Sequence, residues 1–574
     1  MRLNRLEIVG EYKSIRGDRE NPFVYDFVDS HSNYSPLCLV GLNGSGKSNF
    51  IELIADIFGY VDRYYNNQYI CKEDLTYDFE IDYSINDAGS YRSIKIIGRN
   101  SRLDMFTLVD SVIRDSIQSG YHQLLPSNII AYSSGHNQGL SSVFAKSQFQ
   151  YYEVIRKQAA FYRGFQQRYE AISGREDRSE QELSSYVRER YRANSNLFEV
   201  PRGIDDLDDY FDELDLGEPL TYKKANLPIG IFTDHSFNQL VFIYLLISNN
   251  QAFKHFISEE IKISHLCGFE LDLRLSTYRD FEVVNDIASR LIELSADSLG
   301  LPAMGCPPTF NKDTLSGVLR FNLNHNFFSS FERLYLDTSI FLEHLVTLIQ
   351  LSAKKWSSDE CRSLKTSRYI RNVPNVSGGL APIRFINTKI QLLEPNVETL
   401  YDRLSDGEHQ LMQIIGSLIM FGEEESLFIL DEPESHFNPE WRAEFLCLIS
   451  KYTDLHNIEL IISTHSPFVL SACKADRVLA FNKDEEGNVS VQSPGVETYG
   501  ASFDSLLTSV FDLDVLISKK PKAEIERVIE LQKLDQISRN EALERLEIYG
   551  DSFELNFRRN QLRRDASSQE RGNE

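Results

Sequence analysis

The run from Gly41 to Ser48, GLNGSGKS, has residue types and spacing that indicate phosphate chemistry. It fits the pattern G-x-x-x-x-G-K-[S/T], follows an apolar strand predicted at Pro36–Val40, and opens a helix predicted over Asn49–Phe58, which is the context that the pattern requires. Glycines let backbone N–H groups surround a phosphate, and the helix turns its positive N-terminal end toward the same anion. We expect ATP to be held by Asn43, Gly44, Ser45, Gly46, Lys47 and Ser48. Lys47 is predicted to reach the β- and γ-phosphates, and Ser48 to bind Mg²⁺.

Two carboxylates, Asp431 and Glu432, directly follow the apolar residues Leu427–Leu430. Such a run is typical of a buried parallel strand, and open α/β sheets bind ligands at the carboxyl ends of their strands. We expect Asp431 to orient Mg²⁺, directly or through water, and Glu432 to polarise the attacking water. Taken alone, the run also fits a core strand that ends in solvated acids, but the phosphate loop favours the catalytic interpretation.

The segment from Leu404 to Gln410, LSDGEHQ, resembles the signature motif of ABC ATPases, with Asp406 in place of a glycine and Glu408 in place of the glutamine. Ser405 and Gly407 lie where an amphipathic helix is predicted to begin. Ser405 is also a predicted N-cap, with Glu408 three residues later completing a capping box. This structural role is compatible with binding of a γ-phosphate.

Two further segments have counterparts in ABC ATPases. The apolar strand Ile461–Ser463 leads to His465, and this resemblance implies that His465 contacts the γ-phosphate. The segment Ile130–Gln138 is a candidate Q-loop, in which Gln138 is the predicted contact to the nucleotide and Mg²⁺. Asn137 and Ser134 are alternatives for this role, and a plain loop is a further one.

These motifs, in this order, resemble the SMC/RecF-type branch of ABC ATPases, as does the opening segment MRLNRLEIVGEYKSI. The resemblance implies an α/β fold: an ABC-type (P-loop) ATPase head assembled from N- and C-terminal segments and interrupted by a mainly α-helical insertion. It also implies that two heads sandwich two ATP molecules. Each Ser405 then faces the nucleotide held by the other chain's Lys47, so the chain is its own expected partner.

The expected boundaries follow changes in sequence texture. We assign residues 1–145 to the N-terminal half of the head and 375–520 to its C-terminal half. Between them, residues 146–374 are glycine-poor over long stretches and show helical spacing. Residues 521–574 are predicted to be a helical extension with a disordered tail.

Three other segments resemble PtuA-type ATPases of Septu and retron antiphage systems: IIAYSSG, DEPESHFNPE and VETYGASFDSLLTSVFDLD. The resemblance implies a regulatory ATPase subunit that controls or positions a nuclease through ATP-dependent head pairing. The implied partners are an HNH nuclease and, in retrons, a reverse transcriptase with its RNA–DNA product. Asn438 stands where this family often has a histidine.

Two other functions compete with that interpretation. A RecF-like repair or recombination ATPase would bind DNA directly, and a basic stretch with six cations between Lys354 and Arg371 is one surface for it. Four arginines between Arg558 and Arg564 offer another contact for nucleic acid or protein. The second of these functions is that of an intrinsic nuclease, which would resemble the overcoming-lysogenisation family. Such a nuclease needs a glutamate beside an acidic pair to hold metal ions, and Asp512 and Asp514 lack an evident partner glutamate.

Composition restricts these choices further. The net charge is −25, so the chain is not expected to coat nucleic acid indiscriminately. Its seven cysteines show no C-x-x-C pair, which argues against a zinc or thiol–disulfide centre. Apolar runs are too short to cross a bilayer, and the N-terminus lacks the apolar core of a signal peptide. We therefore expect a cytoplasmic protein without a membrane partner.

Overall fold

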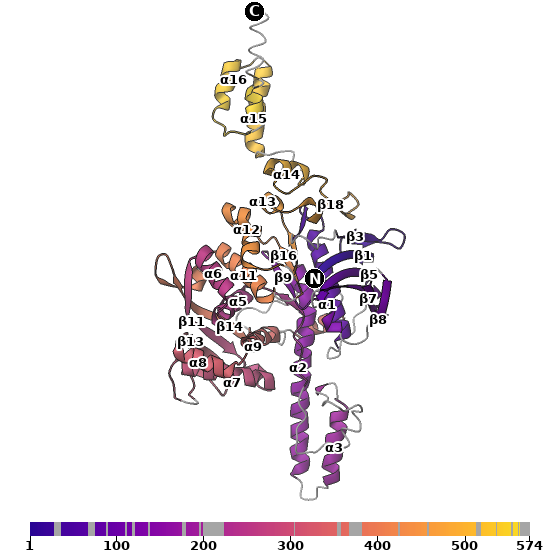
Figure 1. Ribbon diagram of the computed structural model, residues 1–574, viewed down its shortest axis with the longest axis vertical. Coiled ribbons are helices and arrows are strands. Elements are labelled where there is room, and N and C mark those ends of the chain that lie inside the picture. Colours follow the sequence, from indigo (N-terminus) through magenta and orange to yellow (C-terminus); the bar gives the residue numbers. More distant parts are fainter. Residues whose placement is uncertain are drawn as a thin grey trace, which may run out of the picture.

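The computed structural model contains a head of sheets and helices, from which a long helical arm and a C-terminal helical pair extend in opposite directions (Figure 1). The structure describes the chain except residues 28–35, 67–74, 88–89, 110–111, 117–120, 136–137, 175–179, 195–196, 199–222, 303–304, 353–356, 367–380, 423–424, 456–457, 512–517, 535, 553–554, 561 and 563–574.

The central sheet of the head has the strand order β10-β9-β16-β17-β4-β18-β19. All of its neighbouring strands are parallel except β18 and β19. The strands β4, β16 and β17 are buried along their whole length, which accounts for their nearly continuous apolar sequences. The strands predicted before the phosphate loop, before the two carboxylates and before His465 are therefore confirmed. The strand bounds are β4 (Leu37–Gly41), β9 (Ile129–Ser133), β10 (Gly230–Phe232), β16 (Ser426–Asp431), β17 (Ile458–Ser463), β18 (Val478–Lys483) and β19 (Val489–Gln492).

Helix α1 (Lys47–Tyr65) lies between the central sheet and a second, antiparallel sheet. The second sheet has the order β2-β1-β5-β6-β7-β8, and β3 also pairs with β1. Apolar side chains of α1, β1, β5 and β6 share one core with Leu427, Ile429 and Ile461 of the central sheet. This packing fixes the helix that follows the phosphate loop. The bounds are β1 (Arg2–Tyr12), β2 (Ile15–Gly17), β3 (Phe23–Asp26), β5 (Tyr77–Asp87), β6 (Ser90–Arg99), β7 (Arg102–Val109) and β8 (Val112–Ser116).

The arm consists of α2 (Gln138–Ser173) and α3 (Glu180–Arg192), which pack side by side below the head in Figure 1. A small aromatic core holds the two helices together. In it, Phe165 stacks on Tyr169 of its own helix and on Tyr186 of α3. Stacked aromatic pairs of this kind add stability beyond the area that they bury. The arm therefore has a packed core of its own outside the head.

A third sheet, antiparallel and with the order β12-β13-β11-β14-β15, lies to one side of the head. Three of its strands come from a segment for which the sequence analysis predicted mainly helices. Its bounds are β11 (Ile263–Arg274), β12 (Phe310–Asn311), β13 (Ser316–Asn322), β14 (Ile383–Leu392) and β15 (Glu398–Leu400). The helices of this region are α5 (His235–Ile247), α6 (Gln251–Phe256), α7 (Glu282–Ser298), α8 (His325–Leu334), α9 (Thr338–Gln350) and α10 (Ser358–Thr366).

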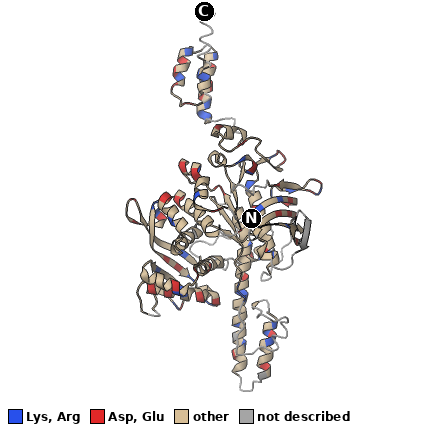
Figure 2. Cartoon of the chain, in the orientation of Figure 1, with Lys and Arg blue, Asp and Glu red and all other residues tan. Residues whose placement is uncertain are grey.

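The remaining helices belong to the C-terminal part of the chain: α11 (Asp406–Phe421), α12 (Pro439–Tyr452), α13 (Pro467–Leu470), α14 (Phe503–Ser509), α15 (Lys519–Lys533) and α16 (Arg539–Leu546). Helices α15 and α16 form the pair at the top of Figure 1, and they have a small hydrophobic core of their own. In Figure 2, acidic residues predominate on α7, whereas α15 carries both signs of charge.

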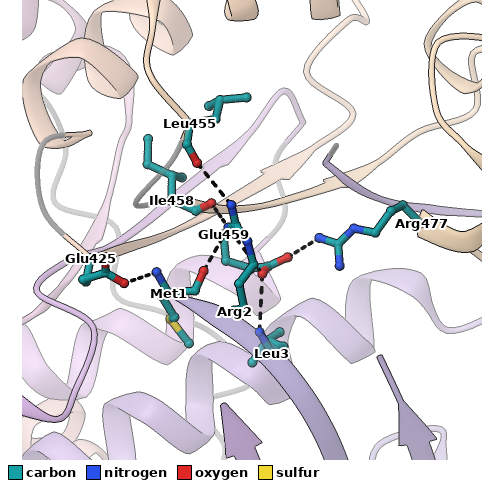
Figure 3. A network of polar contacts seen from close by, with 8 residues as sticks. All are labelled: Met1, Arg2, Leu3, Glu425, Leu455, Ile458, Glu459 and Arg477. Carbon is teal, nitrogen blue, oxygen red and sulfur yellow. Dashed lines mark hydrogen bonds and ion pairs between the residues drawn. The ribbon is translucent and has the colours of Figure 1, made fainter. Parts of the chain in front are cut away.

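The N-terminal strand is attached to the central sheet by the buried polar network in Figure 3. Glu459, on β17, is fully buried and forms ion pairs with Arg477 and Arg2. Its carboxylate also accepts a hydrogen bond from the backbone N–H of Leu3. The amino group of Met1 pairs with Glu425. The N-terminal strand and the segment from Glu425 to Arg477 are thus joined by charge as well as by apolar packing.

Candidate nucleotide site at the carboxyl edge of the central sheet

The predicted phosphate loop connects the end of β4 directly to the first turn of α1. Its glycines at positions 41, 44 and 46 have φ angles of 144°, 79° and 108°, a region that favours glycine. A Cβ added at Gly46 would also come within 2.8 Å of Val489. Successive backbone N–H groups in such a turn form a concave site for an anion. The loop therefore has the backbone form expected of a phosphate cradle.

Side chains of the loop are arranged in keeping with this role. The Lys47 ammonium group folds back over the loop and donates to the carbonyl oxygens of Gly41 (2.9 Å) and Leu42 (3.3 Å). Ser48 is half-buried in the first turn of α1, whereas Asn43 is exposed. Ser45 is buried, and its hydroxyl has no hydrogen-bond partner within the described ranges. Leaving a buried polar atom unpaired is costly, and a phosphate bound by the loop would give this hydroxyl a partner.

The two predicted carboxylates lie at the end of β16, two strands away from β4. Asp431 is buried and accepts a hydrogen bond from the hydroxyl of Ser463 (2.5 Å), while the hydroxyl of Ser133 lies 3.5 Å from it. Glu432 is the first residue beyond the strand and has a φ of 51°, which is unusual for a residue with a side chain. Its backbone N–H donates to the carbonyl of Ser463 (2.9 Å). Strained backbone of this kind clusters at functional sites.

His465 connects the loop to the carboxylates. Its Nε2 atom lies 3.1 Å from the Lys47 ammonium nitrogen and 3.5 Å from a carboxylate oxygen of Glu432. The structure thus brings together three predicted residues from three separate strand ends: Lys47, Glu432 and His465.

The pKa values of these groups are shifted by their shared, partly buried position. Burial lowers the pKa of Lys47 to about 8, although Glu432 and Asp431 oppose this change. Burial, and then the charge of Asp431, raises the pKa of Glu432. Burial, and then the charge of Lys47, lowers the pKa of His465. A neutral imidazole can accept a hydrogen bond from Lys47, and a carboxylate with a raised pKa is suited to accept a proton.

The residues present fit a Mg²⁺-bound nucleotide. The loop supplies the phosphate cradle, and the unpartnered hydroxyl of Ser45 points to a missing acceptor or donor. A serine hydroxyl and a carboxylate are the oxygen donors that Mg²⁺ uses beside phosphates, and Ser48 and Asp431 are the residues that would hold it.

The predicted signature segment forms the start of α11. Ser405 is the N-cap, and with Glu408 it forms the predicted capping box, which is confirmed. Ser405 is exposed, whereas Gly407 is buried against the loop that follows Glu432. Asn438 also caps a helix, because its side chain accepts from the N–H of Trp441 at the start of α12.

Several predicted residues lie at the limit of the described chain. Gln138 is the first residue of α2, but its side chain lies outside the described residues, as does Asn137. Ser134, the other candidate, donates its backbone N–H to the carbonyl of Asp431 (3.2 Å). Most of the basic stretch, both acids of the DxD pair and two of the C-terminal arginines also lie outside: Lys354, Lys355, Arg368, Arg371, Asp512, Asp514, Arg563 and Arg564.

One residue pair of the site was not found from the sequence. Glu434 is buried two positions after Glu432, and its carboxylate accepts a hydrogen bond from the hydroxyl of Thr464. Burial raises the pKa of Glu434. The pair joins the loop after β16 to the loop after β17, and so links Glu432 to His465. The repeated acid in Asp431-Glu-Pro-Glu434 was a signal for it.

The fold is that of an α/β P-loop ATPase head assembled from N- and C-terminal segments, as the sequence predicted. Residues 333–471 match the family described as "AAA domain, putative AbiEii toxin, Type IV TA system". None of the helices in the described ranges is both long and apolar enough to cross a lipid bilayer.

Three curated proteins resemble parts of the chain. Protein ea59 of Escherichia phage lambda is 31% identical over 22% of this chain and 24% of its own length. Septu protein PtuA of Bacillus thuringiensis is 28% identical over 26% of this chain and 42% of its own. The zinc import ATP-binding protein ZnuC of Anaplasma phagocytophilum is 35% identical over 14% of this chain and 31% of its own. The matched region thus spans less than half the length of each relative.

Among solved structures, the SMC head domain from Thermotoga maritima aligns with 86% of this chain and 100% of that chain, at 11% identity and a TM-score of 0.32.

Proposed function

We propose that the chain binds and hydrolyses ATP with Mg²⁺. The observation that carries this proposal is the meeting of Lys47, Glu432 and His465 at one edge of the central sheet. These groups supply a cation for phosphate, a carboxylate for water and a neutral imidazole. Phosphoryl transfer depends mainly on positioning and charge neutralisation, and this arrangement provides both.

Each residue has a distinct part in the proposed reaction. Backbone N–H groups of the loop and the Lys47 ammonium group bind the β- and γ-phosphates, while Ser48 and Asp431 hold Mg²⁺. Mg²⁺, when bound, neutralises charge on the phosphate oxygens. Glu432 orients the attacking water and accepts its proton, for which its raised pKa is favourable. His465, which lies beside the Lys47 ammonium group, orients the γ-phosphate.

We further propose that this ATPase is the regulatory subunit of an antiphage defence complex. The similarity to Septu protein PtuA supports this role, because it accompanies three sequence segments that resemble PtuA-type ATPases. Residues 1–145 and 375–520 are the proposed halves of the head. The exposed Ser405, at the positive end of α11, is suited to meet a phosphate held by a second head. The proposed partners are a second copy of this chain, an HNH nuclease and, in a retron, a reverse transcriptase with its RNA–DNA product.

The ATPase is tested by replacing Glu432 with glutamine. We expect Glu432→Gln to keep ATP binding but to lower steady-state hydrolysis by at least about 100-fold, because the water loses its proton acceptor. Glu440→Gln, in the exposed first turn of α12, is the control and is expected to hydrolyse ATP normally. Hydrolysis by Glu432→Gln at the wild-type rate would remove Glu432 from the mechanism.

The defence role is tested by mass spectrometry of everything that co-purifies with tagged Glu432→Gln protein expressed from its native operon. Recovery of an HNH nuclease, with or without a reverse transcriptase and its nucleic acid, supports the proposed complex. Recovery of the ATPase alone, or with bulk DNA, contradicts it and favours a repair-type ATPase.

A further inference from the structure

The loop between β16 and α12 determines where Glu432 points. Because Glu432 sits at a φ of 51°, its side-chain direction depends on the turn that follows it. In this turn the N–H of Ser435 lies 3.4 Å from the carbonyl oxygen of Glu432, and the N–H of Phe437 donates to the carbonyl of Glu434 (3.1 Å). Ser435 and His436 are exposed, so contacts from neighbouring elements must hold this part of the loop.

Helix α11 provides those contacts with its first two turns. At Gly407, an added Cβ would lie 2.8 Å from the carbonyl oxygen of His436, so the loop approaches this glycine more closely than any larger residue allows. One turn later, the side chain of Gln410 accepts a hydrogen bond from the N–H of His436 (3.2 Å) and donates to the hydroxyl of Ser435 (3.4 Å). Gln410 is only 3% exposed, so loss of these partners would leave buried polar groups unsatisfied.

Gln410 also contacts Tyr132 on β9, the strand that pairs with β16 in the central sheet. Burial raises the pKa of the Tyr132 hydroxyl to about 12, and a hydrogen bond between this hydroxyl and the Gln410 side chain partly opposes the rise. Tyr132 belongs to β9, which pairs directly with β16. Gln410 therefore touches both the loop that carries Glu432 and the sheet from which that loop emerges.

Helix α11 begins directly after Ser405, which is its N-cap and the serine of the segment that resembles the signature motif. Ser405 and Gln410 are separated by little more than one helical turn, and the capping box makes this turn rigid. Farther from the loop, the carbonyl of His409 accepts from the side chain of Asn238 (3.0 Å), which in turn accepts from the hydroxyl of Tyr401 (2.7 Å). The start of α11 is thus fixed on both sides.

We propose that Gln410 is a positioning residue, which holds the Ser435–His436 loop so that the Glu432 carboxylate is directed at the attacking water. It connects the signature end of α11 to Glu432 within one chain, so that a contact made at Ser405 is transmitted to the site of hydrolysis. This inference rests on the proposed ATPase function. Gln410 does not touch the nucleotide in this scheme, so its loss changes turnover and not ATP affinity.

A neighbouring glutamine provides a matched control. Gln413 lies on the same helix and is 5% exposed, close to the value for Gln410. Its side chain donates to the carbonyl oxygens of Thr233 (3.1 Å) and Asp234 (3.2 Å) instead of contacting the loop. Replacement of Gln413 by methionine removes its two hydrogen bonds, whereas replacement of Gln410 removes those to the loop and to Tyr132. Methionine keeps a similar volume in both cases. Only the Gln410 variant releases the loop.

Trp441 reports on the loop without relying on hydrolysis. Its ring packs edge-on against Phe437, with 6.2 Å between centroids, and lies 3.6 Å from the position of a Cβ at Gly407. The chain has two tryptophans, so Trp356→Phe leaves Trp441 as the fluorescent reporter. Acrylamide quenching of Trp441 then measures how tightly the loop packs on α11.

The experiment compares Gln410→Met with Gln413→Met in the full chain, by ATP hydrolysis, ATP affinity, melting temperature and Trp441 quenching. We expect Gln410→Met to lower kcat by about 10- to 100-fold, with ATP affinity unchanged and quenching increased, because small displacements of a catalytic group have effects of this size. Gln413→Met is expected to lower the melting temperature similarly but to keep kcat. Should Gln410→Met not fold, Ser435→Ala at the exposed loop is expected to lower kcat in the same direction.

Equal kcat values for the two methionine variants, or wild-type kcat in both Gln410→Met and Ser435→Ala, overturn the inference. A wild-type chain that binds ATP but does not hydrolyse it overturns the proposed function instead. In that case, unchanged Trp441 quenching in Gln410→Met overturns the positioning role separately.

Discussion

The ammonium group of Lys47 lies 3.1 Å from Nε2 of His465, although 418 residues separate them in sequence. The imidazole must accept this hydrogen bond, so His465 is neutral when Lys47 is charged. Burial lowers the pKa of both residues, which means that the site disfavours their positive charges. A phosphate placed between them reverses this, because a nearby anion favours the charged form. We propose that an anionic ligand completes the charge of this site, which segments far apart in the sequence form together.

Replacement of Lys47 by alanine is expected to weaken ATP binding by about 10- to 100-fold and to abolish hydrolysis. The reason is the loss of charge-assisted hydrogen bonds to the phosphates, each worth about 1.5–3 kcal/mol. Binding is measured by titration calorimetry. Lys389→Ala, an exposed lysine on β14, is the control and is expected to bind ATP normally. Unchanged affinity in Lys47→Ala would place the nucleotide elsewhere.

ATP affinity is expected to depend on pH through Lys47. Its pKa is about 8 in the free protein, and bound phosphate raises that pKa. The favourable contribution is therefore complete below about pH 8 and is lost as the pH rises from that value toward the higher pKa of the ATP-bound state. Affinity should fall about tenfold from pH 7 to pH 9.

Titration calorimetry across this range measures the slope, and Lys47→Arg provides the comparison. An arginine stays charged throughout, so this variant is expected to bind more weakly at pH 7 but with little change up to pH 9. A wild-type slope that persists in Lys47→Arg would show that another group titrates.

Much of the central sheet and of the site could be predicted from the sequence because the signals are local. The run Leu427–Leu430 is buried on both faces of the sheet, so its strand is nearly all apolar and ends visibly at two acids. The phosphate loop has fixed spacing because its backbone must adopt positive φ at particular positions. The cap at Ser405 is decided by residues three positions apart.

The parts that could not be predicted depend on contacts between distant segments. Strand β11 pairs with β14, and Leu271 lies opposite Phe385, but neither strand has a motif that selects this partner. The contact between Glu434 and Thr464 follows from the parallel register of β16 and β17, which a single sequence does not specify. Gln410 is the last residue of the segment that resembles the signature motif, but its contacts to Ser435 and His436 depend on how the loop after β16 packs on α11.

Loss of the negative charge at Glu459 is expected to destabilise the head without touching the nucleotide site. Glu459→Gln leaves Arg2 and Arg477 buried without their carboxylate, at a cost of about 3–5 kcal/mol. The free energy of unfolding is measured by guanidinium denaturation. Glu440→Gln, an exposed acid, is expected to leave it unchanged. A Glu459→Gln protein as stable as wild type would contradict the network in Figure 3.

Replacement of Ser405 by arginine tests head pairing apart from ATP binding. Ser405 is exposed, so the longer side chain is tolerated within one head, and the lost N-cap costs only about 1 kcal/mol. At the proposed interface, however, arginine fills the space that the partner's phosphate requires. In a Glu432→Gln background, we expect Ser405→Arg to bind ATP normally but to remain unpaired in analytical ultracentrifugation.

Ser405→Thr is the control for this prediction, because threonine keeps both the hydroxyl and the cap, and it is expected to pair as Glu432→Gln alone does. Two outcomes would contradict the assignment of the signature segment. The first is ATP-dependent pairing that persists in Ser405→Arg. The second is loss of pairing in Ser405→Arg together with loss of ATP binding, since a residue that acts on the partner's nucleotide must leave its own chain's site intact.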